Sequence, residues 1–534
     1  HTLFSVGGSS ASNEIILHSA VADRDIVLVD RNCHKSLNYA LNMSGAIPVY
    51  LRARRNARGL IGPVPSSEIE PAMVARKIAE SPLVKGKSKA KPVLAVLTNS
   101  TYDGLCYDVE RTTALLSKSV DRIHYDEAWY AYARFHPIYE GRYGMHRGKR
   151  SKDDATVTVT HSTHKLLAAL SQASMIHIRE GRIPVEPALF NEAFMMHTST
   201  SPQYSIIAST DVSAKMMDDA GPAMMEECIR EAIDFRKAML RIGRDLAKRK
   251  SGDWWFETWQ SDQVKTKTFL DADPDVLASS SDAWTLQPRQ SWHGFGDLGS
   301  GYCMLDPIKV TTLTPGIGPN GKLQKEGIPA PIVSRFLATR GIVEEKTEPY
   351  SILTLFSIGI TRGKWGSLVA ALMAFKELYD ANAPLSRALP ELVSDHPERY
   401  GKLGLREFAA EMHAANKEHN LLESIDGAFS NLPEPVLSPR DTFARLVHRD
   451  VEQVPAAKLG GRTLSVQVVP YPPGIPLLMP GGRFGPKTRA VGDFLLGLEA
   501  FDAKFPGFAH HTHGVEVKTD KSGKLYYALY CLRE

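Results

Sequence analysis

Short apolar runs alternate with amphipathic segments over the first 180 residues, and this alternation constrains the fold more than any other feature. The amphipathic segments, such as PSSEIEPAMVARKIAES with its opening proline and serines, are typical of helices. The apolar runs are typical of strands buried on both faces; they read DIVLVD, AIPVYL, PVLAVLTN, RIHYD, ATVTVTHS and ASMIHIRE. Strands that alternate with helices predict βαβ units, and therefore a mostly parallel sheet covered by helices on both faces.

Polar residues follow three of the predicted strands, at residues 99–103, 126–129 and 162–165. The carboxyl ends of parallel strands meet at one edge of a sheet, and ligands bind beyond that edge. We therefore expect these three segments to form a ligand site.

The composition bounds the class of protein. A chain of 534 residues with 43% hydrophobic and 23% charged residues is typical of a globular protein with more than one core. The net charge of +4 is small, so we expect no nucleic-acid partner. Five scattered cysteines without CxxC spacing indicate neither disulfides nor zinc and predict a cytoplasmic location. No run is long enough to cross a membrane, and no signal peptide is recognisable.

The pattern changes beyond about residue 217, where a long helical segment, a tryptophan-rich segment and a mixed α+β region follow. We expect a large domain over residues 1–215, which carries the parallel sheet and the ligand site. Smaller α+β domains are expected over residues 216–365 and 366–534. The C-terminal stretch GVEVKTDKSGKLYYALY predicts a hairpin that turns at Lys-Ser-Gly. The chain starts at His1 without a methionine, and we expect an N-terminal segment to precede it.

The first chemical motif is VGGSSASNEI, in which two glycines and the hydroxyls of Ser9 and Ser10 open a helix. Free N–H groups and the helix dipole favour a phosphate there, although a serine at this place is also a common N-cap. The second motif is HYDEAW, in which Asp126 ends a strand at the ligand edge. A carboxylate there either meets a cation or hydrogen-bond donors, or caps the next helix.

The third motif is HSTHK, which brings Ser162, His164 and Lys165 to the same edge. A lysine of lowered pKa in a partly dry site can form a Schiff base, whereas the alternative is an exposed loop lysine. Pyridoxal phosphate needs a lysine for its aldehyde, an acid that keeps its pyridine nitrogen protonated, and donors for its phosphate. The three motifs match those needs and predict pyridoxal phosphate as the cofactor.

Six longer stretches resemble the bacterial inducible Orn/Lys/Arg decarboxylases, in order, from about residue 4 to the C-terminus. They are DRNCHKSLNYAL, TNSTYDGLCYDV, STHKLLAALSQASMIHI, NEAFMMHTSTSPQY, LDPIKVTTLTPG and PYPPGIPLLMPG. The resemblance implies an α/β large domain of the aspartate-aminotransferase-like type, fold type I of the pyridoxal phosphate enzymes. STHKLLAALSQASMIHI looks closest to the lysine branch, which implies conversion of L-lysine to cadaverine and CO₂, with arginine or ornithine as the alternative substrate.

The resemblance also implies roles for single residues. Three catalytic residues are implied: Lys165 for the aldehyde, Asp126 for the pyridine nitrogen and His34 for stacking on the ring. Further cofactor contacts are implied for Ser9, Ser10, Trp129, Ser162, His164 and, from a neighbouring subunit, Ser199. Glu345, with Glu344 beside it, resembles the acid that faces the cationic end of the substrate. A site shared in this way implies at least a homodimer. The larger members of the family form higher oligomers, so the resemblance also implies a decamer as a further assembly of this chain.

The sequence departs from the family pattern in places. Gly482 stands where glutamate is expected, and Glu127 of DEAW stands where some relatives have serine. The larger members also carry an N-terminal wing domain, which we expect to be missing from residues 1–534.

Other functions stay open at this point. Transamination on the same fold would yield a keto acid instead of CO₂, and a catalytically silent regulatory paralogue would lack a cofactor absorbance. The cluster HHTHG near the C-terminus (His510, His511 and His513) has no second set of ligands, so no metal is expected. Because decarboxylation consumes a proton, a role in acid tolerance or polyamine supply is a further hypothesis, which a deletion strain would test.

Overall fold

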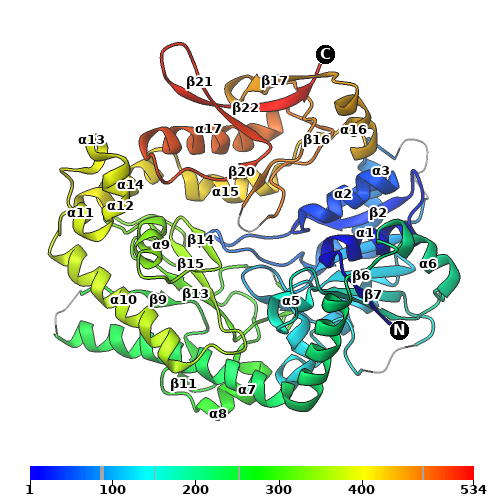
Figure 1. The fold of residues 1–534 in the computed structure, drawn as a ribbon, viewed down its shortest axis with the longest axis horizontal. Helices are drawn as coiled ribbons and strands as arrows, with labels where there is room; N and C mark the ends of the chain where they lie inside the picture. The colour runs from blue at the N-terminus through cyan, green and yellow to red at the C-terminus, as the bar shows by residue number, and fades with distance from the viewer. Residues whose placement is uncertain (85–89, 149–150, 250–252, 297, 472–473) are drawn as a thin grey trace.

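The computed structural model describes residues 1–84, 90–148, 151–249, 253–296, 298–471 and 474–534. Its largest sheet has seven strands in the order β1-β8-β7-β6-β4-β2-β3. This sheet lies on the right of the molecule in Figure 1. The strands are β1 (Thr2–Ser5), β2 (Ile26–Asp30), β3 (Ile47–Leu51), β4 (Leu94–Thr98), β6 (Arg122–Asp126), β7 (Thr156–His161) and β8 (Ser174–Arg179).

Five neighbouring strands of this sheet, β3, β2, β4, β6 and β7, run parallel. At one edge, β8 pairs antiparallel with β7, and β1 pairs antiparallel with β8. The prediction of a mostly parallel sheet is therefore confirmed. The strand β1 was not predicted, because four residues carry too little pattern to indicate a strand.

Helices cover both faces of the sheet, as the apolar runs predict. They are α1 (Gly8–Ala20), α2 (Lys35–Ser44), α3 (Pro71–Glu80), α4 (Val109–Leu116) and α6 (Pro187–Met196). Alternate residues of β2 face opposite sides: Val27 and Val29 pack in one apolar cluster with α1 and α2, whereas Leu28 packs with α3 and α4. Burial on both faces explains why these strands read as continuous apolar runs.

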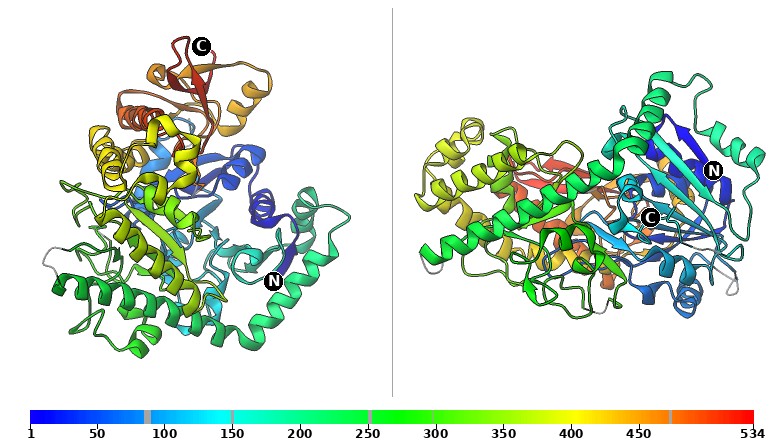
Figure 2. Two further views of the ribbon diagram at one scale, coloured as in Figure 1. Left: turned by 60° about the vertical axis from the view of Figure 1, so that its left-hand side comes forward. Right: turned by 90° about the horizontal axis from the view of Figure 1, so that it is seen from below.

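The 46-residue helix α7 (Tyr204–Arg249) runs from the seven-stranded sheet to a second, antiparallel sheet (Figure 2). That sheet has the order β14-β15-β13-β9 and is followed in the chain by α10. The elements of this region are β9 (Glu257–Thr258), α8 (Pro274–Ser279), β13 (Lys309–Leu313), α9 (Ala330–Ala338), β14 (Lys346–Glu348), β15 (Ser351–Leu355) and α10 (Arg362–Asp380). A short strand, β12 (Cys303–Leu305), pairs with β5 (Leu105–Tyr107) of the first region.

The C-terminal part is a helical segment followed by a three-stranded sheet of order β17-β22-β21. Its longer elements are α14 (Leu405–Glu418), α15 (Leu421–Ser430), α16 (Pro439–Val447), β17 (Val451–Pro455), α17 (Arg489–Lys504), β21 (Val515–Thr519) and β22 (Leu525–Leu532). The predicted C-terminal hairpin is confirmed as the antiparallel pair of β21 and β22. Among the described residues, no helix combines the length and apolar character that a membrane span requires.

Candidate active site

A pocket of about 270 Å³ opens at the carboxyl ends of β2, β4, β6 and β7. Its wall is completed by the N-terminal end of α1, the segment before β14, the end of β15 and a C-terminal loop. The lining residues are Ser9, Asn32, His34, Thr98, Ser100, Tyr102, Asp126, Ala128, Trp129, Lys165, Leu166, Glu345, Leu355, Tyr471 and Ile475. The expectation that the three polar segments after the strands converge on one site is confirmed.

Lys165 reaches this pocket from α5 (Thr163–Leu166), a single helical turn directly after β7. Its backbone N–H donates to the carbonyl of Ser162 at 3.0 Å, which fixes the turn. The side chain stays solvent-accessible through the open pocket. The surrounding protein nevertheless removes enough water to lower the pKa of the amine, against the opposing effect of Asp126 and Glu345. A lysine of lowered pKa has the free amine that carbonyl chemistry needs.

Asp126, the last residue of β6, is buried, with 3% of its surface exposed. Its carboxylate accepts hydrogen bonds from Nδ2 of Asn13 at 3.0 Å and from the backbone N–H of Ala128 at 3.1 Å. The amide of Asn13 is itself oriented by Nε2 of His124, which lies 3.0 Å from its Oδ1. Burial lowers the pKa of His124 to about 4, so the ring is neutral and donates from Nε2. Asn13 was not predicted as a site residue.

His34 lies at the other side of the pocket, where it caps the N-terminus of α2. Its Nδ1 accepts from the backbone N–H of Ser36 at 3.3 Å and lies 2.9 Å from the Ser36 hydroxyl. Burial lowers the pKa of His34 despite the opposing charge of Asp126. The result is a neutral ring in a fixed orientation, which suits a stacking contact.

Two aromatic rings line the pocket, and a buried lysine packs on one of them. The rings of Trp129 and Tyr102 lie 4.4 Å apart, and the Tyr102 hydroxyl donates to Oε1 of Glu345 at 3.0 Å. Lys309 places its Nζ 4.4 Å from the centre of the Trp129 ring and donates to the Ser100 hydroxyl at 2.5 Å. Tyr102 lay in a predicted segment without an assigned role. Lys309 was not predicted at all, because nothing local shows that β13 begins beside residue 100.

The predicted phosphate-binding residues are only partly brought together. Ser9 lines the pocket, and because α1 is capped by Gly7 without a side-chain bond, Ser9 is not an N-cap. Ser162 is fully buried, and its hydroxyl has no hydrogen-bond partner among the described residues. His164 turns its Nδ1 to the carbonyl of Ala173 at 2.8 Å and does not line the pocket, and Ser10 is exposed outside it.

Ser199 is not among the residues that line this chain's own pocket; it lies in the exposed loop between α6 and α7. Its hydroxyl accepts the backbone N–H of Ser201 at 3.1 Å. A contact with a neighbouring subunit's site stays a prediction.

Glu127 forms a buried network directly behind the site, which was not predicted. Its Oε1 accepts from Nδ2 of Asn99 and from the backbone N–H of Gly144, both at 2.7 Å. Its Oε2 lies 3.2 Å from Nε2 of His161, and Nδ1 of His161 lies 3.1 Å from Nε2 of His177. Glu127 thereby joins the carboxyl ends of β4, β6 and β7, which carry Ser100, Asp126 and the turn with Lys165.

The protonation of this network follows from burial. Burial raises the pKa of Glu127 to about 8, against two hydrogen bonds that lower it. Burial also lowers the pKa of His161 to about 4 and that of His177 to about 3, so both rings are neutral. At neutral pH, Glu127 is therefore protonated and donates to His161, which in turn donates to His177.

The sequence matches two family descriptions. Residues 1–364 match the major domain of the Orn/Lys/Arg decarboxylases, and residues 422–533 match their C-terminal domain. The chain belongs to the Orn/Lys/Arg decarboxylase family. Family membership makes it an amino acid decarboxylase and implies dependence on pyridoxal phosphate.

Curated relatives of this decarboxylase are named for lysine, arginine or ornithine. It is 48% identical to the lysine decarboxylase LdcA of Pseudomonas aeruginosa, over 100% of this chain and 69% of that protein. It is 45% identical to the biodegradative arginine decarboxylase of Escherichia coli, over 96% of this chain and 68% of that protein. It is 41% identical to the inducible lysine decarboxylase of Escherichia coli, over 96% of this chain and 68% of that protein.

Solved structures confirm the fold. Lysine decarboxylase A from Pseudomonas aeruginosa superposes with a TM-score of 0.93 at 48% identity, over 100% of this chain and 69% of that one. The constitutive lysine decarboxylase of Escherichia coli superposes with a TM-score of 0.88 at 39% identity, over 100% of this chain and 70% of that one. The predicted fold type I architecture of the decarboxylase is thereby supported at the level of the whole chain.

Among the residues that the structure describes, no three or more His, Cys, Asp or Glu side chains lie together so that they could hold a metal ion. Of the three clustered histidines, His510 instead hydrogen-bonds Asp502 through Nδ1 at 2.7 Å.

Proposed function

We propose that this chain decarboxylates L-lysine to cadaverine and CO₂ with pyridoxal phosphate bound at Lys165. The observation that carries the proposal is the convergence of Lys165, Asp126, His34 and Glu345 on one pocket of about 270 Å³. An amine, a buried carboxylate and a second acid at the far wall are the groups that a cofactor-bound basic amino acid requires.

The residues present fit the cofactor. Lys165 would hold its aldehyde carbon, Asp126 its pyridine nitrogen and His34 its ring face. Ser9, at the start of α1, would bind the phosphate together with free N–H groups of the first helical turn. The unpartnered hydroxyl of Ser162 supports a further polar ligand at this end of the site, because a buried hydroxyl without a partner is unfavourable.

When bound, the cofactor supplies an electron sink for the bond to the leaving carboxylate. Asp126 supports that sink by holding a proton at the pyridine nitrogen, and Asn13 and Ala128 hold its carboxylate in place. A proton must then return to the substrate Cα. Lys165 is the proposed donor, because it lines the pocket and its lowered pKa eases proton transfer near neutral pH. His164 is a poor donor, since its Nδ1 faces the carbonyl of Ala173.

Recognition of the substrate's distal cation is proposed for Glu345. One of its carboxylate oxygens accepts from Tyr102, which leaves the other for an ammonium group. A guanidinium prefers both oxygens of a carboxylate, whereas an ammonium needs only one close acid. The engagement of Glu345 with Tyr102 and the 48% identity to a lysine decarboxylase both favour lysine. Arginine is the second candidate, supported by the 45% identity to an arginine decarboxylase.

We further propose that the site is shared within a homodimer at minimum. The loop with Ser199 is flanked by exposed apolar side chains on α6 and α7: Leu189 is 71%, Met196 69%, Tyr204 80% and Val212 66% exposed. Apolar surface that gathers in this way favours a protein interface. A decamer would be built from such dimers.

The deciding experiment measures CO₂ release from the purified protein with pyridoxal phosphate and lysine, arginine or ornithine offered separately. The expected result is a clear preference in kcat/KM for lysine and the formation of cadaverine. A preference for arginine would replace the substrate but keep the reaction. A keto acid without CO₂ would indicate transamination. No turnover together with no cofactor absorbance would favour the regulatory paralogue, and no turnover despite a bound cofactor would refute the proposed reaction.

A further inference from the structure

A buried arginine outside the active site has donors without partners. Arg31 follows β2 and has only 3% of its surface exposed. Its Nη2 donates to the carbonyl oxygens of Pro476 at 3.0 Å and Leu477 at 3.1 Å. Its Nε and Nη1 find no hydrogen-bond partner in the part of the chain that the structure describes. Unpaired donors of a buried cation are costly, so a ligand is expected to meet them.

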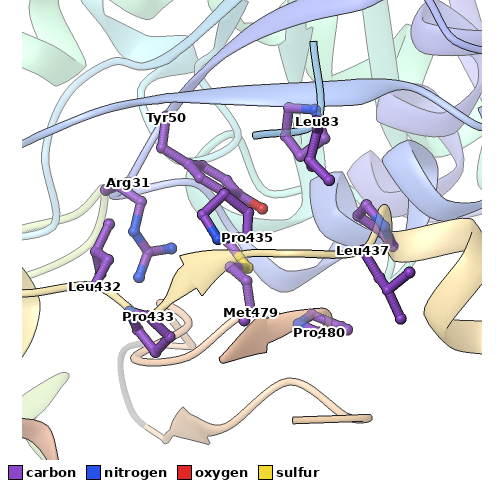
Figure 3. Close-up of a pocket in the computed structure, with 12 residues that line it drawn as sticks. Arg31, Tyr50, Leu83, Leu432, Pro433, Pro435, Leu437, Met479 and Pro480 are labelled. Carbon is purple, nitrogen blue, oxygen red and sulfur yellow. The ribbon is translucent and has the colours of Figure 1, made fainter. Parts of the chain in front are cut away.

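The guanidinium of Arg31 lies at a small cavity of about 20 Å³ between the first and the C-terminal parts of the chain (Figure 3). Its wall is almost entirely apolar and includes no acidic residue; Arg31 is joined by Pro48, Tyr50, Leu83, Leu432, Pro433, Pro435, Leu437, Pro439, Met479, Pro480 and Gly482. Gly482 lines the cavity without a side chain, so this position offers no group that could meet Arg31.

The neighbouring acid does not neutralise Arg31. Asp30 precedes it in the chain, but its carboxylate accepts from the backbone N–H groups of Asn32 at 2.7 Å and Thr98 at 3.1 Å. Burial raises the pKa of Asp30 to about 7, which leaves it only partly charged at neutral pH. Burial also raises the pKa of Cys33 to about 12, so that thiol is neutral. Arg31 therefore lacks a fully charged partner: Asp30 compensates its charge only in part, and the ring centre of Tyr50 lies 5.3 Å from its guanidinium carbon.

We propose that the cavity beside Arg31 binds one small monovalent anion, such as chloride. A cavity of about 20 Å³ admits a single atom-sized ligand. Water would accept a hydrogen bond from Arg31 but leave its charge uncompensated, whereas an anion does both. The apolar contacts from proline and methionine suit a weakly hydrated anion.

The anion would act at the boundary between two parts of the chain and beside the active site. Asn32, next to Arg31, and Ile475, next to Pro476, both line the active pocket. Occupation of the cavity would hold Pro476 and Leu477 against the end of β2, and would thereby stabilise that wall of the pocket.

The first test is diffraction from crystals of the cofactor-bound protein soaked in sodium bromide, because bromide reports its position by anomalous scattering. The expected result is one strong peak beside Nη1 of Arg31. A water molecule at that place, with no anomalous peak, would overturn the proposal without any variant having to fold.

The second test is thermal unfolding of the holoenzyme in sodium chloride against sodium gluconate at equal ionic strength, since gluconate is too large for the cavity. Tm should rise by roughly 1–3 °C in chloride and saturate. The variant Arg31→Met should lose this difference. Arg24→Met is the matched control: Arg24 is an exposed arginine at the same boundary, paired with Asp441 at 3.2 Å, and its variant should keep the difference. A bromide peak without any chloride effect on Tm would mean an adventitious ion only and would also refute the proposal.

Discussion

Asp126 and Glu127 are consecutive acids with opposite surroundings. Asp126 faces the pocket, near Lys165 and His34, and accepts hydrogen bonds from the Asn13 amide and the backbone N–H of Ala128. Glu127 faces away from the pocket, and its protonated carboxyl joins three strand ends through Asn99, Gly144 and His161. One acid is thus available for chemistry and the other for holding the loops in place.

The pH dependence of stability should show the protonation of Glu127. Its pKa is raised from 4.5 to about 8 on folding, so the folded state binds more protons than the unfolded state between these values. Its contribution to stability is therefore lost as pH rises from about 4.5 to about 8. The free energy of unfolding should fall by at most about 1.4 kcal/mol per pH unit because of this one group. Urea unfolding of the holoenzyme at several pH values would measure it.

The variant Glu127→Gln is the matched control, because its amide keeps a donor for His161 and an acceptor for Asn99 and Gly144 but does not titrate. Its stability should lack this slope while its kcat stays within about threefold of the wild type. Glu127→Ala should lower both stability and kcat. Identical pH profiles for the wild type and Glu127→Gln would show that Glu127 is ionised in the folded protein.

Lys165 and Asp126 should dominate the loss of activity among single substitutions. Lys165→Ala should reduce kcat by about 10³-fold or more and abolish the cofactor absorbance that depends on the lysine. Asp126→Asn should reduce kcat by about 10²–10³-fold, because a neutral amide cannot hold the pyridine proton. The control Lys118→Ala alters an exposed lysine outside the pocket and should behave as wild type. Wild-type CO₂ release from Lys165→Ala would refute the assigned role.

At the scale of elements, helix α1 brings two groups to the site from one face: Ser9 at its start and Asn13 one turn later. Asn13→Ala removes the side-chain donor to Asp126 and leaves His124 without its acceptor. We expect kcat/KM to fall roughly tenfold, or about 1.4 kcal/mol, with the fold retained. Steady-state kinetics with circular dichroism as the folding control would check this, and an unchanged kcat/KM would show that the Ala128 N–H suffices.

The strands of the parallel sheet were predictable because each is a local apolar run, and so was their common ligand edge. The antiparallel direction of β8 could not be predicted, because an apolar run does not show whether a strand pairs parallel or antiparallel with its neighbour. Helix α7 begins well before the predicted helix and continues through Pro222. There Gly221 packs so closely on Phe135 that a Cβ would lie 2.8 Å from the ring, and this packing overrides the local Gly-Pro signal. The predicted division at residue 215 falls inside α7 and stays a proposal.

The site itself was predictable only where its residues follow strands or match family motifs. Lys165, Asp126, Trp129 and His34 do so, and the structure brings them together. Asn13 and Lys309 were missed because their approach to the site depends on tertiary packing. The buried Glu127 was seen only as a departure from the family pattern, since a sequence does not show on which side of a strand end a carboxyl is buried.

At the scale of the whole molecule, a shared site predicts complementation between two inactive chains. Lys165→Ala and Ser199→Glu, which places a carboxylate against the expected phosphate, should each be inactive alone. Mixed after dissociation, they should recover roughly a quarter of the wild-type activity, because half of the dimers are hybrids and each hybrid has one intact site. Mixing Lys165→Ala with Asp126→Asn is the control and should recover nothing, since both residues belong to one chain's pocket. No recovery in the first mixture would place Ser199 outside the partner's site.

The pocket draws on Ser9 near the beginning of the chain and on Tyr471 and Ile475 near its end. During synthesis, the sheet and its lysine emerge from the ribosome long before the loop that closes the opposite wall. A nascent chain therefore has an open cleft at this place, and the cofactor can enter without passing a finished wall. The loop with Tyr471 and Ile475 completes the enclosure late in synthesis, so a product truncated before this loop would hold its cofactor loosely and be open to water.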